Sequence, residues 1–221
     1  MKGLLIKDTK IILNQKRFLI LFLFVAIMLS FSMDASFIVS YIPMVGVIMI
    51  LSTISYDYHD DGFSFLMTLP IKPGDYAVAK YVFTILGMSV FWVISVILQF
   101  ASFFIQKSPF DLTETILTDV CMLPLFLFIA SIVIPIDIKF SPEKVRVIMF
   151  LFFGVIMVAF MAGKALLGTL ADNTGIDMVS KLEALDSINP VVIFIALFAF
   201  CIICLSISMT YSIRLMQKRE F

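Results

Sequence analysis

Charged residues are scarce in this chain of 221 residues. They make up 14% of the sequence, and 62% of the residues are hydrophobic. An ordinary soluble domain carries about 25% charged residues. So few charges cannot cover the surface of a water-soluble domain of this length. We therefore expect one all-α membrane domain over residues 1–221, with any ATP-driven or enzymatic machinery on another polypeptide.

The motifs of nucleotide-binding and catalytic sites are also missing. A phosphate-binding loop needs the pattern G-x-x-x-x-G-K-[ST], but Ala165 follows Gly163-Lys164. Zinc protease chemistry needs two histidines, and His59 is the only one in the chain. A serine nucleophile would need a deep histidine or lysine as its base, and the hydrophobic runs offer none. The sequence predicts no catalytic residue, no metal site and no cofactor on this chain.

Ionisable and thiol groups inside the hydrophobic runs give no sign of ion coupling or redox chemistry. Asp34, Asp119 and Asp137 all lie at the ends of runs, whereas proton-coupled carriers place carboxylates deep in the membrane. Cys201 and Cys204 form a C-x-x-C pattern in the middle of a run. We interpret these thiols as apolar packing.

Long hydrophobic runs fill most of the remaining chain. A helix needs about 20 apolar residues to cross a bilayer core of about 30 Å. The first run follows the basic N-terminus and is too long for the apolar region of a signal peptide. We predict six transmembrane helices, over residues 18–33, 36–55, 77–105, 117–136, 147–163 and 190–213.

The basic residues between these runs are sorted by side. Six crossings place both termini on one side, and thirteen of the sixteen lysines and arginines fall there. Lysine and arginine are enriched in cytoplasmic loops. The sequence therefore predicts a multi-pass membrane protein with cytoplasmic N- and C-termini. The three on the other side are Lys107, Lys164 and Lys181.

The first sixteen residues carry apolar side chains at helical spacing, with polar ones between them. Leu4, Leu5, Ile11 and Ile12 make up the apolar set, and Lys7 and Asp8 belong to the polar set. This pattern predicts an interfacial helix on the cytoplasmic leaflet. The alternative is a simple cytoplasmic extension of the first span.

The predicted cytoplasmic loop between the second and third spans contains a short apolar segment. It follows Asp60 and Asp61, covers residues 63–69 and stops at Pro70. Seven residues allow about two helical turns, and an acidic residue suits the start of such a helix. An apolar helix exposed in the cytoplasm needs a partner or the membrane surface.

Two further features concern the later spans. Ser141 precedes Pro142 and Glu143, a pattern typical of a helix that begins at the proline. Gln99 is the most polar residue deep in any run. It indicates either a hydrogen bond between helices or a position on a substrate path.

Four segments, in order and on the predicted cytoplasmic side, resemble the permease subunits of ABC-2 type exporters. They are the basic N-terminal helix, the stretch from Asp57 through Leu69-Pro70 to Lys80-Tyr81, residues 134–146, and the C-terminal segment from Ser208 to Phe221. The resemblance is strongest to small six-span permeases of bacterial peptide exporters, such as those for phenol-soluble modulins and lantibiotics. It covers almost the whole chain. Ser141-Pro142 departs from the glycine-containing turn expected there.

The resemblance implies a transporter with two separate ABC ATPase subunits, which bind ATP and magnesium. A second permease completes it, either another copy of this chain or a sister protein. Its substrates are amphipathic or hydrophobic peptides, or drugs, exported from the cell. It implies no nucleic-acid partner, and the surrounding lipid is the other contact.

The resemblance also assigns site residues. The segment between the second and third spans becomes the cytoplasmic coupling helix that docks on the ATPase. Its apolar docking face comprises Phe63, Phe65, Leu66 and Leu69, with polar contacts from Asp57, Asp60 and Asp61. A second cytoplasmic contact comprises Lys139, Glu143, Lys144 and Arg146.

Two other classes of protein remain open at this point. A polytopic membrane protein without transport activity, such as an assembly factor or a sensor anchor, would need no ATPase and could dispense with residues 60–70. An intramembrane enzyme is the other, and the missing catalytic pairs argue against it.

Overall fold

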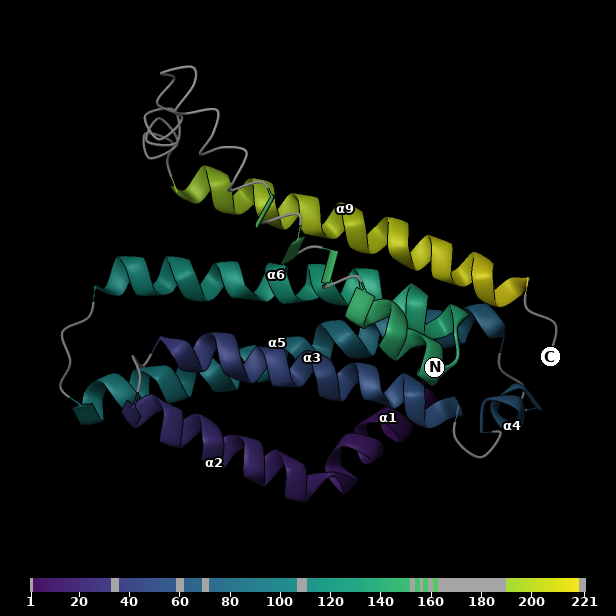
Figure 1. The fold of residues 1–221 in the computed structure, drawn as a ribbon, viewed down its shortest axis with the longest axis horizontal. Helices are drawn as coiled ribbons and strands as arrows, with labels where there is room; N and C mark the ends of the chain where they lie inside the picture. The colour runs from purple at the N-terminus through teal and green to yellow at the C-terminus, as the bar shows by residue number, and fades with distance from the viewer. Residues whose placement is uncertain are drawn as a thin grey trace, which may run out of the picture.

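The computed structural model shows a bundle of long helices (Figure 1). It describes residues 2–32, 36–58, 62–68, 72–106, 111–151, 154–155, 157–158, 161–162 and 190–218. Every regular element in these ranges is an α-helix, as the sequence predicts. The helices are α1 (Lys2–Asn14), α2 (Lys16–Ser32), α3 (Phe37–Tyr58), α4 (Gly62–Thr68), α5 (Pro73–Gln106), α6 (Leu112–Lys139) and α9 (Pro190–Gln217).

Within the described part of the chain, four helices are long and apolar enough to cross a membrane: α3, α5, residues 115–139 of α6 and residues 194–217 of α9. Helices α1 and α2 meet at a bend of 63° and would make a fifth crossing if the pair is one span. The predicted fifth span, 147–163, lies only partly within the described residues. The structure thus supports a multi-pass membrane protein, and the six-span count stays a prediction.

The spans differ from the predicted ones mainly at their ends. Helix α3 runs to Tyr58 and α5 begins at Pro73, so both continue past the expected ranges toward α4. Helix α5 has 34 residues, about 50 Å at 1.5 Å per residue. This exceeds a hydrocarbon core of about 30 Å. A helix of this length must tilt or extend beyond the hydrocarbon. Helix α1 packs against α5.

Helices α3 and α5 form the centre of the bundle, with α6 and α9 on one side and α2 on the other (Figure 1). Glycines bring α3 and α5 close together. A Cβ at Gly46 would lie 2.7 Å from the Phe91 ring, and one at Gly87 would lie 2.8 Å from Cδ1 of Ile50. Small residues let membrane helices approach each other in this way.

A proline in α6 explains one contact between α6 and α9. Pro135 has no N–H, so the Ser131 carbonyl four residues earlier loses its partner within the helix. The Ser208 hydroxyl on α9 donates a hydrogen bond to this carbonyl. Tyr81 on α5 joins the same contact through Ser208 at 2.6 Å and Ser212 at 2.9 Å. Neighbouring helices thus satisfy the backbone group that the proline frees.

The helix after α6 begins where the sequence predicts. Helical residues run from Pro142 to Leu151, and the Val145 N–H donates to the Ser141 carbonyl at 3.0 Å. Pro142 therefore occupies the first helical position, where the missing N–H costs no hydrogen bond.

Candidate functional site

The short helix α4 lies at one end of the bundle, between the end of α3 and the start of α5 (Figure 1). It confirms the helix expected in this loop, although it is one residue longer at the start and ends at Thr68. The Leu66 side chain packs against a buried cluster that includes Tyr76, Ile138 and Met216. Phe65 points away from this cluster and is 67% exposed. Helix α4 is thus anchored on one side and presents an aromatic ring on the other.

The other residues of the predicted docking face lie outside the described part of the chain. This holds for Asp60, Asp61 and Leu69, and for the side chain of Phe63. The start of α4 packs back on α3, because a Cβ at Gly62 would lie 3.2 Å from the Asp57 carbonyl oxygen.

A group of buried charges lies beside α4, where α1, α3 and α5 meet. We call Lys7, Asp8, Asp57 and Lys80 the charge cluster. The Lys80 ammonium lies 2.9 Å from both carboxylate oxygens of Asp8 and 2.9 Å from Oδ2 of Asp57. The Lys7 ammonium contacts the Asp57 carboxylate and lies 3.4 Å from that of Asp8. Two cations therefore face two anions at the junction of three helices.

Polar side chains complete the surroundings of the charge cluster. The Tyr76 hydroxyl donates to Asp57 at 2.8 Å, and Lys80 donates to the Thr53 hydroxyl at 3.2 Å. Asp8, Asp57 and Lys80 are at most 4% exposed. Charges so far from water are tolerated when they are paired and hydrogen-bonded. The charge cluster therefore fixes α1 to α3 and α5 with a defined geometry.

The N-terminal helix α1 has one face buried against the bundle and another face exposed. Leu4 and Asp8 are buried against the bundle, whereas Ile6 and Leu13 are more than half exposed. Helix α1 packs on α3 and α5, and its place at the membrane interface stays a prediction. Asp57, expected among the polar contacts to an ATPase, has its carboxylate partners inside the chain.

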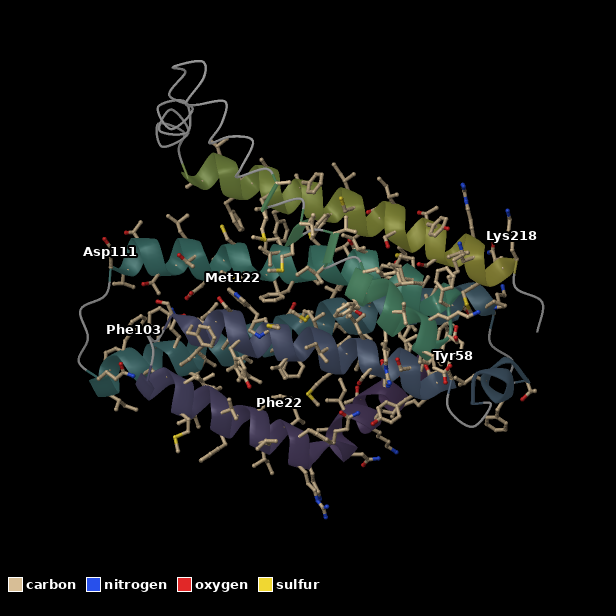
Figure 2. The ribbon with its side chains drawn as sticks, viewed as in Figure 1. Phe22, Tyr58, Phe103, Asp111, Met122 and Lys218 are labelled. Atoms are coloured by element: carbon tan, nitrogen blue, oxygen red, sulfur yellow. The ribbon has the colours of Figure 1, made fainter. Side chains whose placement is uncertain are left out.

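A hydrogen bond joins the same end of the bundle to α6. The Tyr58 hydroxyl donates to the Ile138 carbonyl at 2.8 Å. Figure 2 shows Tyr58 at the α4 end, opposite Asp111. The residues of the predicted second contact lie near this end of α6, and all four are exposed: Lys139, Glu143, Lys144 and Arg146.

Gln99 lies far from this end and is 1% exposed. With its amide nitrogen turned toward α6, it donates to both carboxylate oxygens of Asp119, at 2.9 and 3.0 Å. The Trp92 indole N–H donates to the Asp119 carbonyl at 2.6 Å. Gln99 thus makes a hydrogen bond between helices, one of the two expected alternatives. Its position on a substrate path stays a prediction.

The sequence predicts Asp8 on the polar side of α1 and does not predict the charge cluster. One signal was present. Leu4, Asp8 and Ile12 lie four residues apart, so Asp8 shares a helical face with two apolar residues. A carboxylate in that position indicates a buried partner.

Together these features define a class: a polytopic α-helical membrane protein with a short helix exposed at one end and no metal-binding cluster among the described residues. The family described as ABC-2 family transporter protein matches residues 3–217. The chain belongs to this family and is a permease-type membrane subunit of an ABC transporter. Permeases of this kind work with an ABC ATPase. No curated protein and no solved structure matches the chain.

Proposed function

We propose that this chain is the membrane subunit of an exporter that moves amphipathic or hydrophobic peptides, or drugs, out across the bacterial cytoplasmic membrane. Two ABC ATPase subunits drive it, and a second permease, identical or a sister chain, completes the pathway. The N- and C-termini face the cytoplasm. The 24 phenylalanines and 14 methionines suit an apolar substrate drawn from the bilayer.

The observation that carries this proposal is the geometry of α4. Leu66 anchors the helix in the bundle, and Phe65 is 67% exposed on its outer side. Exposed aromatic residues on a small rigid element are typical of interface anchors. In the proposal, Phe65 inserts into the ATPase surface, with Phe63 and Leu69 beside it and Asp60 and Asp61 as polar contacts.

The charge cluster supports a path from α4 to the spans. Asp57 lies five residues before α4, and Tyr76 lies eight residues after it. Both belong to the same hydrogen-bonded group, which includes Asp8 of α1. A push on α4 by the ATPase therefore moves α1, α3 and α5 together, because their relative positions are fixed at this point. Lys139, Glu143, Lys144 and Arg146 provide the second contact.

The test is retention of the ATPase on the purified permease. The wild-type chain is isolated from native membranes, and the ABC ATPase that accompanies it is identified. Phe65→Asp is expected to reduce ATPase retention at least tenfold, because it places a charge in an apolar contact. Phe65→Leu is the matched control and should retain the ATPase.

Membrane insertion and the elution profile in detergent must be unchanged in both variants. Equal ATPase retention by Phe65→Asp and the wild type would rule out docking through α4. Absence of any ABC ATPase from the wild-type sample would argue against the transporter itself.

A further inference from the structure

An apolar cavity of about 200 Å³ lies between α2, α3 and α5. Leu19, Ile20 and Leu23 line it from α2, Tyr41 from α3 and Phe91 from α5. It is smaller than the roughly 300–1,000 Å³ of sites for drug-sized ligands. Its size and lining suit part of one acyl chain better than a whole substrate molecule.

A lysine continues the same stripe of α2 toward the bend with α1. Lys16, Leu19, Ile20 and Leu23 are spaced as i, i+3, i+4 and i+7, so they share one face of the helix. Arg17 follows directly, and both cations are exposed. The lining of the cavity thus continues along α2 to Lys16, with Arg17 next to it in the chain.

The start of α2 at the bend carries positive charges that an anion would balance. Helix α2 has two cations and no acidic residue in its first turn. Cations are unfavourable at a helix N-terminus, where the helix dipole is positive, and an anion is favoured there. A headgroup phosphate supplies this negative charge.

We infer that the bend between α1 and α2, together with the adjoining cavity, is a binding site for one anionic glycerophospholipid. One acyl chain occupies the cavity between α2, α3 and α5. The headgroup phosphate contacts Lys16 and Arg17, in the leaflet that these residues face. Basic pockets beside membrane helices recognise lipid headgroups in this way. The site is independent of ATPase docking.

The experiment measures lipid retained by the purified full-length chain in detergent, with phosphatidylglycerol and phosphatidylcholine of identical chains as probes. Native mass spectrometry counts the bound lipids. The wild type is expected to retain one phosphatidylglycerol with at least tenfold preference over phosphatidylcholine. The double variant Lys16→Gln/Arg17→Gln should lose this preference, because it removes both basic residues that attract the anionic headgroup.

Matched variants separate the site from general effects of charge and size. Lys144→Gln/Arg146→Gln removes the same charge elsewhere and should leave the preference unchanged. Ile20→Trp narrows the cavity mouth and should reduce retention of both lipids, whereas Leu21→Trp, on a similarly exposed neighbour outside the lining, should not. Ile20 is 66% exposed, so the larger side chain does not overpack the core.

Three results would overturn the inference. The first is equal retention of the two lipids by the wild type. The second is equal loss of preference in the two charge-removal variants. The third is dissociation of a dimer by Ile20→Trp with lipid retention unchanged, which would assign the cavity to contact between copies of the chain.

Discussion

At the scale of single residues, the buried charges of the charge cluster depend on one another, and Lys80 is the residue that pairs with both carboxylates. Its ammonium lies 2.9 Å from the carboxylates of both Asp8 and Asp57. Without it, two carboxylates would share the Lys7 ammonium, which is partly exposed. Removing one partner of a buried ion pair destabilises a protein more strongly than replacing the pair by apolar groups.

Lys80→Met is therefore expected to lower the free energy of unfolding by about 3–5 kcal/mol. The double variant Asp8→Asn/Lys80→Met restores one cation to one anion, so its loss should be well below the sum of the two single losses. Denaturant unfolding in mixed micelles measures all three variants as a double-mutant cycle. Lys10→Met, on the exposed side of α1, is the control and should be near neutral. Additive losses would show that Asp8 and Lys80 do not interact.

At the scale of elements, a hydrogen bond joins α6 to α9 at a backbone carbonyl that has no partner within its own helix. Pro135 removes one hydrogen bond from α6, and Ser208 of α9 donates to the carbonyl left over. This contact depends on the proline as well as on the serine. It lies next to the charge-cluster end of the bundle and belongs to the packing that holds α9 on α6.

Ser208→Ala is expected to destabilise the chain by about 1 kcal/mol, the usual size of a hydrogen bond between membrane helices. In a Pro135→Ala background the cost should fall, because the new N–H at 135 takes over the Ser131 carbonyl. Ser206→Ala is the control, since its hydroxyl bonds the Ile202 carbonyl within its own exposed helix. Denaturant unfolding in mixed micelles measures the free energy of unfolding of these variants. A cost that is unchanged by Pro135→Ala would contradict this explanation of the contact.

The sequence predicts elements better than it predicts the contacts between them. Hydropathy located α3, α5, α6 and α9, and the Ser141-Pro142 pattern gave the start of the next helix. The end of α3 and the start of α5 were not predicted. The predicted spans end where polar residues begin, because hydropathy falls there, but both helices continue into these polar residues. Tertiary packing decides such ends.

The candidate site at α4 and the charge cluster could be predicted only in part, because tertiary packing decides which side chains are buried there. A short apolar run before a proline indicated α4, and Leu66 and Phe65 were both named for its docking face. Which of the two is anchored and which is exposed depends on the packing of α4 on the bundle. The pairing of Asp8 with Lys80 joins positions 72 residues apart, and local periodicity carries no information about such a partner.

The whole molecule combines a lipid-facing bundle with a polar end. Helices α1 and α4 lie at this end (Figure 1), and the charge cluster joins α1 to α3 and α5 there. Large apolar side chains on α2, α5 and α9 are exposed along much of their length, as expected for helices that contact lipid. If α4 is the contact for an ATPase, this polar end must face the cytoplasm. The excess of lysine and arginine on that side predicts the same orientation.

Thiol labelling at position 65 tests this account most directly. Phe65→Cys is placed in a chain whose Cys121, Cys201 and Cys204 have been replaced. We expect no reaction of the thiol introduced at position 65 with an impermeant maleimide in intact cells. We expect labelling in inverted vesicles, and protection from it when the ABC ATPase is added. Lys107→Cys, on the predicted outer side, is the control and should react in intact cells. Labelling of position 65 from outside intact cells would contradict the account.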